Sequence, residues 1–412
     1  MRKTKKRRIF FRVFPFNRLS YPVLLKAWEC SKIDREFDIK IIDRDDIFKK
    51  IDFKKDDVLL YSFMTPFLPL IHNEIAAIKS SGALIVAGGP HVSGEQDLAF
   101  AAGFDILFVG AGEDSFLRFG RDLLDNNIEK EKYHSRPGRE NSNLNDYLPI
   151  SKYLKTIPPI EIMRGCFRKC KYCGTGLQDV HFRSLNSIRS YLDEMKQKKL
   201  KRVNFISPSA LEYEAKKGKP APVEKIEKLL QLVQSYEFKF LEYGIFPSEI
   251  RPDTLSDESM KVLKKYVSNR AITIGAQSSL DSRLKELGRE HNTADIIKAV
   301  EIAKANDFTV NLDFILGFPD ETTEERALTI EFIKKITGRY RVKTQLHFFF
   351  PLPGSGYGYR FPSFLTLSEK ENLLKLKKDG ICRAGWIDNE KQVIRYFNWL
   401  ERHFPGYYSR YH

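Results

Sequence analysis

Short, almost wholly apolar runs alternate with stretches of helical periodicity along the first 130 or so residues. Such runs are typical of strands that are buried on both faces of a sheet. The runs are "RRIFFRVFPF", "FDIKIID", "DDVLLYSFM", "ALIVAGGP" and "FDILFVGAG". Helical periodicity falls between them, over Ala27–Asp34, Leu68–Ser80 and Glu95–Ala102. The pattern predicts an α/β domain with a doubly wound parallel sheet.

Small residues follow three of these runs, in "YSFMTP", "AGGPHVSG" and "VGAGEDS". In open parallel sheets, ligands bind beyond the carboxyl ends of the strands. Glycine there lets a large ligand approach the backbone closely, although glycine can also simply end a strand. Because three such ends occur in one sheet, we favour a binding site.

A polar stretch, "RPGRENSNLNDYLP", interrupts the pattern and reads as a linker before a second βα series. The strands of that series are expected in "PPIEIMRG", "KRVNFISP", "KFLEYGIFPSEI", "RAITIGAQS", "FTVNLDFILGFP" and "RVKTQLHFFFPLPG". About six repeats are too few for a closed eight-stranded barrel and indicate a partial (β/α)6 barrel. The expected organisation is a Rossmann-like domain over 1–135, a linker over 136–157, the barrel over 158–362 and a helical C-terminal region over 363–412.

Composition and charge add little to this organisation. The chain has 412 residues, 42% of them apolar and 30% charged, which is typical of a folded protein. No apolar run is long enough to span a membrane, and the basic start resembles no signal peptide, so we expect a cytoplasmic protein. The net charge of +15 permits a nucleic acid, an acidic protein or an anionic cofactor as partner. Lysines that solvate helix faces explain it more simply, since the basic residues are spread along the chain.

Three of the five cysteines fall within "MRGCFRKCKYCGTG", at Cys166, Cys170 and Cys173. Thiolates are soft ligands that suit iron–sulfur clusters, and three of them leave one iron of a four-iron cluster open. A zinc site is the alternative, and it would need a fourth ligand such as His181.

The cationic neighbours of the three cysteines are expected to favour the thiolate form. These neighbours are Arg164, Arg168, Lys169 and Lys171. The isolated Cys30 and Cys382 are expected to be free, buried thiols.

The Cys-x3-Cys-x2-Cys spacing, with Tyr172 before the last cysteine, resembles the cluster loop of radical S-adenosylmethionine (SAM) enzymes. The segment Gly275–Glu325, with "GAQSS" and "LDFILGFPDETTEE", is similar to the barrel of the methylthiotransferase-like branch. "FFFPLPGSGY" resembles the last strand of that barrel. The similarity covers roughly residues 158–360 with the motifs in matching order.

This resemblance implies a [4Fe-4S] cluster on the three cysteines and reductive cleavage of SAM. It also implies SAM contacts from strand-end residues that face the cluster loop. The expected contacts are Ser207, Ser209, Glu249, Arg251, Gln277, Asp313 and Gly317. Each has a structural alternative, because Gln277 or Asp313 could cap backbone groups and Glu249 could pair only with Arg251. No residue is assigned a catalytic role.

The first domain resembles the cobalamin-binding domain that precedes many radical SAM barrels, through "GGPHVSG" and "DILFVGAGEDSF". The D-x-H-x-x-G motif that supplies a histidine to cobalt is absent from residues 1–130. Many members of this class bind cobalamin without that histidine, and His91 could be only a turn residue. The residues expected at a cobalamin are Ser62, Thr65, Gly88, Gly89, Pro90, His91, Gly110, Gly112 and Glu113.

Together the resemblances identify a class B radical SAM methylase-like enzyme with a [4Fe-4S] cluster, SAM and cobalamin. We expect methylation of an unactivated carbon in a small-molecule, lipid or peptide substrate, with ferredoxin or flavodoxin as electron donor. One alternative is a radical rearrangement or cyclisation in which cobalamin is structural or absent. A weaker alternative is a tRNA-modifying methylthiotransferase-like enzyme, against which no second cysteine trio is found in the first domain. A non-enzymatic cobalamin sensor would leave the three cysteines unexplained.

Overall fold

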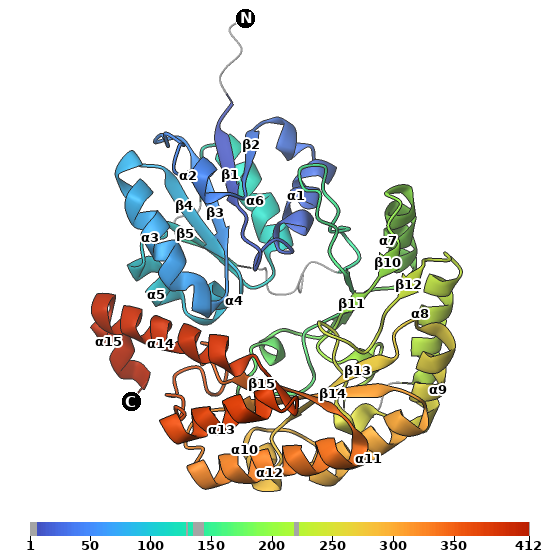
Figure 1. The fold of residues 1–412 in the computed structure, drawn as a ribbon. Coiled ribbons are helices and arrows are strands. Elements are labelled where there is room, and N and C mark those ends of the chain that lie inside the picture. The colour runs from blue at the N-terminus through green and yellow to red at the C-terminus, as the bar shows by residue number, and fades with distance from the viewer. Residues whose placement is uncertain (1–5, 129–130, 135–143, 218–221, 412) are drawn as a thin grey trace, which may run out of the picture. The chain divides into compact units, whose positions relative to one another are not determined.

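The computed structural model describes residues 6–411 except 129–130, 135–143 and 218–221. The chain divides into two compact units, shown with their elements in Figure 1. The N-terminal unit comprises Met1–Pro158, Leu352–Gly354 and Asn398–Tyr408. The barrel unit comprises Pro159–Pro351, Ser355–Phe397 and Ser409–His412. The predicted domain boundaries stay predictions, and much of the expected linker lies outside the described residues.

The N-terminal unit is built on a six-stranded sheet in the order β2-β1-β3-β4-β5-β6, with all neighbours parallel. Its strands are β1 (Arg8–Arg12), β2 (Asp38–Ile42), β3 (Val58–Ser62), β4 (Leu84–Gly88), β5 (Ile106–Val109) and β6 (Glu131–His134). Its helices are α1 (Tyr21–Cys30), α2 (Asp45–Phe48), α3 (Leu68–Ile78), α4 (Pro90–Gly94), α5 (Gln96–Ala101) and α6 (Gly112–Leu124). The strand order changes direction beside β1, which is where doubly wound sheets bind ligands.

The core of this unit lies between the sheet and the pair α1 and α6. Trp28 of α1 stacks on Phe116 of α6 at 4.3 Å between ring centroids, and its indole N–H donates to the Phe116 carbonyl oxygen at 2.8 Å. Alternate strand residues such as Phe11 and Leu60 complete this core. On the other face, the buried Arg12 pairs with Glu74 of α3 at 2.6 Å, and Glu74 also accepts a hydrogen bond from Tyr61.

The five predicted strands of this unit are present, but two details of the prediction are wrong. The sixth strand, β6, was not expected, because "EKYH" carries no apolar run. The first helix covers Tyr21–Cys30 rather than Ala27–Asp34, because Pro22 suits the first turn of a helix. Cys30 is consequently exposed at the helix end rather than buried.

The barrel unit carries short parallel pairs, β7–β11 and β10–β12, and a four-stranded parallel sheet β13–β14–β15–β16. Its strands are β7 (Ile160–Glu161), β8 (Met163–Arg164), β9 (His181–Phe182), β10 (Arg202–Val203), β11 (Phe205–Ile206), β12 (Phe240–Leu241), β13 (Ala271–Gln277), β14 (Thr309–Leu316), β15 (Lys343–Phe348) and β16 (Cys382–Ala384). A parallel bridge between Ile250 and Ile274 continues the arrangement towards β13.

Helices follow the strands of the barrel unit. They are α7 (Leu185–Gln197), α8 (Val223–Gln234), α9 (Asp257–Tyr266), α10 (Asp281–Glu286), α11 (Thr293–Ala305), α12 (Thr323–Tyr340), α13 (Leu367–Lys378) and most of α14 (Trp386–His403). The end of α14 from Asn398 and the short α15 (Pro405–Tyr408) belong to the N-terminal unit. The C-terminal region is therefore not purely helical, because β16 pairs with β15 and extends the sheet. Three residues, "CRA", are too few to show a strand period. Among the described helices, none is long and apolar enough to cross a membrane.

The two faces of the four-stranded sheet differ in polarity. One face carries buried side chains such as Ile274, Leu312 and Leu346. The opposite face carries polar side chains at alternate positions, including Asp313 and Gln345, which line a cavity. Since successive strand residues point to opposite faces, this alternation gives the barrel an apolar outside and a polar inside.

Alanine substitutions at two helical glycines, one in α6 and one in α12, test how closely these helices are packed. A Cβ at Gly120 of α6 would stand 2.8 Å from the Trp28 ring, whereas one at Gly338 of α12 would meet nothing within 4 Å. Gly120→Ala should destabilise the protein by about 1–3 kcal/mol through overpacking. Gly338→Ala should stabilise it by about 0.5–1 kcal/mol through the lower backbone entropy of alanine. Thermal unfolding of both variants checks the pair, and shifts of equal sign would contradict this packing.

Candidate functional site

The loop that carries the three cysteines leaves the barrel through a hairpin. Strand β8 pairs antiparallel with β9, with Arg164 opposite His181. Gly165 follows β8 with φ +74°, and a Cβ there would collide with the carbonyl oxygen of Asp179. Glycine is therefore required where the chain turns into the cysteine loop.

The cysteine loop is anchored by backbone hydrogen bonds from two distant segments. The Lys171 N–H donates to the Leu287 carbonyl at 2.9 Å, and the Lys171 carbonyl accepts from the Tyr357 N–H at 2.7 Å. Apolar side chains, among them Leu287, Phe318 and Tyr357, form a buried cluster against which Tyr172 packs. This packing fixes the loop between its second and third cysteines.

Backbone N–H groups near the thiols point at sulfur. Cys166 Sγ accepts from the Arg168 N–H at 3.4 Å, and Cys173 Sγ accepts from the Thr175 N–H at 3.4 Å. Cys170 is buried, while Cys166 and Cys173 are half-buried. Burial raises the pKa of the Cys166 thiol, and the Arg168 N–H opposes this shift only in part.

The structure corrects the expectation that the neighbouring arginines favour the thiolate form, because both arginines form ion pairs with carboxylates. Arg164 pairs with Glu161 at 2.8 Å. Arg168 pairs with Glu212 at 3.2 Å, with Asp253 at 3.3 Å and with Glu290. Because carboxylates already neutralise both guanidinium groups, neither offsets the desolvation of Cys166.

A zinc site would require a fourth side chain that converges with the three cysteines on one metal ion. Across residues 6–411, outside the three gaps given above, no three His, Cys, Asp or Glu side chains converge so that they could hold one metal ion. This finding concerns a single ion. In an iron–sulfur cluster each thiolate binds a different iron, so its ligands do not converge on one point.

Arg289 connects the cysteine loop to the barrel. Its Nη1 lies 3.9 Å from Cys170 Sγ and donates to the Tyr172 hydroxyl at 3.1 Å. Its Nη2 donates to the Gly275 carbonyl at 2.6 Å. Burial raises the pKa of the Tyr172 phenol, which keeps it neutral. The sequence analysis missed Arg289, although "LGREH" after a short helix places a charged residue beside the motif.

Three polar side chains converge on Gly275. A Cβ there would stand 2.7 Å from Gln277 Nε2, 3.7 Å from Arg289 Nη2 and 3.7 Å from Glu249 Oε2. Gln277 is buried with φ +68°, at a register shift between Gly275 and Gln277. A non-glycine residue in this region is uncommon and tends to mark a functional site. The structure thus brings two predicted SAM residues, Glu249 and Gln277, towards the anchored cysteine loop.

Other predicted SAM residues lie on the loops after β11 and β12. Ser207 Oγ donates to the Ser209 carbonyl at 2.8 Å, so this hydroxyl is already engaged. Arg251 pairs with Asp253 at 3.2 Å, which corrects the alternative that it pairs only with Glu249.

Several buried polar atoms around these loops have no hydrogen-bond partner among the described residues. They include Ser209 Oγ, Glu212 Oε2, Ser248 Oγ and the Nε atoms of Arg168, Arg251 and Arg289. Buried polar atoms are normally satisfied, so a group of them beside one loop fits a polar ligand. The set offers both donors and acceptors, as a ligand with amino, carboxylate and hydroxyl groups requires. The residues present therefore fit a cluster with SAM bound beside it.

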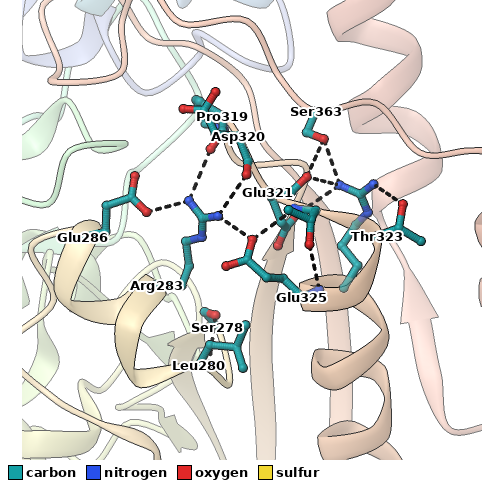
Figure 2. Close-up of polar contacts among 12 residues, drawn as sticks. Ser278, Leu280, Arg283, Glu286, Pro319, Asp320, Glu321, Thr323, Glu325 and Ser363 are labelled. Atoms are coloured by element: carbon teal, nitrogen blue, oxygen red, sulfur yellow. Dashed lines mark hydrogen bonds and ion pairs between the residues drawn. The ribbon is translucent and has the colours of Figure 1, made fainter.

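Gly317, the last predicted SAM residue, begins a loop held by an ionic network, shown in Figure 2. Its φ is +80°, and its N–H donates to Glu321 Oε2 at 2.5 Å. Arg283 binds the Pro319 carbonyl at 3.3 Å and Glu325 at 2.5 Å. Arg326 binds the Glu321 carbonyl at 2.9 Å.

The same network reaches α10 and α13. Arg283 also pairs with Glu286, and Arg326 pairs with Glu369, each at 2.6 Å. Burial raises the pKa of Glu321 to about 7. The loop after β14 is therefore held from both neighbouring helices, which keeps the Gly317 backbone in place.

A cavity of about 340 Å³ opens on the polar face of the sheet. Glu249, Asp313 and His347 all line it, with His347 Nε2 at 3.6 Å from Asp313 Oδ2. The nearby carboxylate of Asp313 raises the pKa of His347. Burial and the nearby Asp313 raise the pKa of Glu249 from 4.5 to about 7. Asp313 thus belongs to the cavity wall, deeper along β14 than Gly317.

The predicted cobalamin residues of the N-terminal unit gather at the carboxyl ends of β3, β4 and β5. The Phe63 N–H donates to the Gly88 carbonyl at 3.2 Å. Gly89 has φ +98°, and a Cβ there would stand 2.8 Å from the Phe63 backbone. Ser93 Oγ accepts from the Gly110 N–H at 3.0 Å. These contacts connect the three strand ends into one surface.

Polar side chains of this set are partly turned into the unit. His91 is buried, its Nδ1 lies 3.1 Å from Thr65 Oγ1, and its ring stacks on Phe63. Burial lowers the pKa of His91 to about 3, so the ring is neutral. These contacts agree with the turn-residue interpretation of His91. Glu113 is buried as well.

Comparison with known proteins decides the family of the barrel unit. Residues 160–333 match the Radical SAM superfamily model. The chain carries a radical SAM domain. An uncharacterised protein of Methanocaldococcus jannaschii is 24% identical, with 86% of this chain and 79% of the relative covered. The predicted radical SAM enzyme is thus confirmed.

Solved structures support the fold of both units. The radical SAM methyltransferase TsrM from Kitasatospora setae, determined with cobalamin and a [4Fe-4S] cluster, has a TM-score of 0.60 at 14% identity. That alignment covers 86% of this chain and 77% of TsrM. The cobalamin-dependent radical SAM enzyme OxsB has a TM-score of 0.58 at 15% identity, over 80% of this chain and 51% of OxsB. The radical SAM domain of this chain therefore has the fold of cobalamin-binding radical SAM enzymes, which confirms the predicted fold class.

The raised pKa of Glu249 gives stability a pH dependence. Between about pH 4.5 and 7 the unfolded chain loses this proton while the folded chain keeps it, so the free energy of unfolding falls as pH rises. Glu249→Gln removes the ionisation. The stability of the variant relative to wild type should therefore increase across this window and level off above about pH 7.5.

Urea unfolding at several pH values from 5 to about 8 measures this difference. A difference that stays constant with pH would show that Glu249 is not desolvated in the folded state.

Proposed function

We propose that this protein is a cobalamin-dependent radical SAM methyltransferase that holds a [4Fe-4S] cluster on Cys166, Cys170 and Cys173. The observation that carries the proposal is the anchored cysteine loop beside buried polar atoms without partners. Three thiolates leave one position of such a cluster open, and the neighbouring polar atoms offer hydrogen bonds to SAM. The substrate is a carbon centre that is hard to activate.

When bound, a reduced cluster would supply the electron for cleavage of the sulfonium of SAM, and methylcobalamin would supply a methyl group. The residues of this chain would bind and orient the cluster and SAM. Arg289 holds Cys170 and Tyr172 against the Gly275 carbonyl, so the loop keeps its position relative to the strand ends. Gln277 and Glu249 present polar atoms beside Gly275, where the absence of a Cβ makes room for the Gln277 amide. The apolar cluster under Tyr172 excludes water from one side of the loop.

Cobalamin would bind beyond the ends of β3, β4 and β5. The fold likeness to TsrM and OxsB, whose structures include cobalamin, supports this part of the proposal. Thr65 and His91 contact each other inside the unit, so the residues that would hold cobalamin are the glycine-rich strand ends at Gly88, Gly89 and Gly110. Ferredoxin or flavodoxin would supply electrons, in the reducing cytoplasm that free cysteines favour.

The contact of His91 Nδ1 with Thr65 also favours a second candidate, although Nε2 of the same ring has no hydrogen-bond partner among the described residues. A radical SAM enzyme that rearranges or cyclises its substrate would need the cysteine loop and SAM but no methyl donor. Its N-terminal unit could keep the fold while cobalamin is structural or absent.

The cluster is tested by anaerobic reconstitution of the full chain. Wild type should contain about four iron and four sulfide and should convert SAM to methionine and 5′-deoxyadenosine on reduction. Cys170→Ala should lose both properties, while Cys382→Ala, at the buried free cysteine in β16, should keep them. Iron and sulfide analysis with product chromatography measures both. One zinc per chain in place of iron would disprove the proposal.

Cobalamin binding is tested by the visible spectrum of the protein after incubation with hydroxocobalamin and gel filtration. Wild type should retain about one cobalamin per chain. Gly89→Val should lose the cobalamin, because a side chain added at Gly89, directly after β4, would collide with the backbone of Phe63. Gly406→Ala, at a glycine with nothing within 4 Å of its added Cβ, is the matched control. SAM cleavage without cobalamin retention in wild type would favour the second candidate.

A further inference from the structure

The cavity on the polar face of the β13–β16 sheet shares Glu249 with the contacts assigned to the cluster loop, and its other lining residues take no part in those contacts. Its volume of about 340 Å³ is in the range of small-molecule sites. We call it the lumen cavity. Its lining is Phe246, Glu249, Thr273, Asn311, Asp313, Lys343, Thr344, Gln345, His347 and Arg383. Except at Phe246, these side chains are polar, so the cavity fits a polar molecule better than a lipid chain.

Opposite charges lie on different strands of this cavity. Glu249 and Asp313 supply carboxyl groups on the β14 side. Lys343 of β15 and Arg383 of β16 supply cationic groups. Within the described part of the chain, no acidic side chain forms an ion pair with Lys343 or Arg383. This contrasts with Arg283 and Arg326 nearby, which pair with glutamates.

The register of the sheet sets the separation of the charges. Gln345 of β15 lies between Asp313 of β14 and Arg383 of β16, since it is the register partner of both. Adjacent strands are about 4.8 Å apart, so the two charged residues are about 10 Å apart at the backbone. They therefore do not neutralise each other directly. A molecule with a positive and a negative end can contact both.

Contacts around the charged groups fix the central side chains. His347 lies 3.6 Å from Asp313, and its backbone neighbour Phe348 donates to Asn389 of α14 at 3.4 Å. A Cβ at Gly385 would collide with the amide of Gln345, so this glycine gives Gln345 its place between the charges. Phe246, with 76% of its surface exposed, adds one apolar wall. An exposed aromatic side chain beside a polar cavity is suited to the carbon skeleton of a ligand.

Solvation by water is the simplest alternative for Lys343 and Arg383, since both are exposed. Two exposed cations alone would not indicate a ligand. The observation that indicates a ligand is that Lys343 and Arg383 share one cavity with Asp313 and Glu249, with the amide of Gln345 between the opposite charges. The sequence also predicted Asp313 as a SAM contact, but its place in the cavity wall, deeper than Gly317, is better suited to a second molecule.

We propose that the lumen cavity binds a small zwitterionic substrate, with its ammonium group at Asp313 and its carboxylate at Lys343 and Arg383. The proposal deepens the proposed function, on which it rests, by naming the substrate class. It places Phe246 against the carbon chain. It also makes Arg383 a residue that selects for the carboxylate and Asp313 one that selects for the amine.

Three matched probes test the charge requirement on the full chain: 6-aminohexanoate, hexylamine and hexanoate. Their carbon chains have the same length, and only the first carries both charges. By calorimetry at low salt, 6-aminohexanoate should bind at least about ten-fold more tightly than either singly charged probe. Arg383→Gln should reduce its affinity to about that of hexylamine. Asp313→Asn should reduce it to about that of hexanoate.

Arg395→Gln, at an exposed arginine of α14 outside the cavity lining, is the matched control and should bind like wild type. Equal affinity for all three probes, or no binding of 6-aminohexanoate to folded wild type, would overturn the proposal. Loss of affinity in Arg395→Gln equal to that in Arg383→Gln would also overturn it. Circular dichroism establishes that each variant is folded.

Iron content and SAM cleavage are measured on the same wild-type preparation. If SAM is cleaved but the zwitterion shows no preference, the substrate class is wrong and the radical SAM function stands. If the zwitterion binds as expected but SAM is not cleaved, the proposed function fails while the cavity assignment stands.

Discussion

The contact on which the site depends is the guanidinium of Arg289. One planar group reaches Cys170 Sγ, the Tyr172 hydroxyl and the Gly275 carbonyl. Arginine can serve three acceptors at once because its donors are held in a rigid fork. Burial keeps the Tyr172 phenol neutral, so the arginine faces a hydroxyl rather than a phenolate. A loop with three cysteines is thereby fixed to the end of β13 through an arginine that lies 119 residues after Cys170 in the sequence.

Buried polar atoms without hydrogen-bond partners are the second constraint on the barrel unit. Atoms such as Ser209 Oγ and Glu212 Oε2 are buried without partners beside the cysteine loop. Their desolvation costs free energy in the folded protein unless another molecule completes the hydrogen bonds. The ionic network around Arg283 and Arg326 differs, because its guanidinium charges are paired with glutamates and hold a loop in place, although Arg283 Nε also lacks a hydrogen-bond partner. The contrast separates residues that build the scaffold from residues that are suited to a ligand.

Much of the site was visible in the sequence because its residues are local. The three cysteines, the glycine after β8 and "GAQSS" lie in short motifs whose spacing follows from one strand end. Five of the six strands of the first sheet were found because each is an apolar run. Strands β6 and β16 were missed because "EKYH" and "CRA" have no apolar pattern. Their pairing with β5 and β15 depends on backbone hydrogen bonds, which any residue except proline can form.

The sequence by itself determined the fold class, the cysteine trio and the strand ends at which ligands were expected, since these depend on local pattern and spacing. Only the tertiary structure decided which charges are neutralised. Arg168 was expected to favour the thiolates, but Glu212 and Asp253 reach it from other loops. Arg251 pairs with Asp253 rather than with Glu249, and His91 is held by Thr65. Long-range pairing of side chains depends on how strand ends meet in space. Local sequence patterns do not reveal which distant residues meet there.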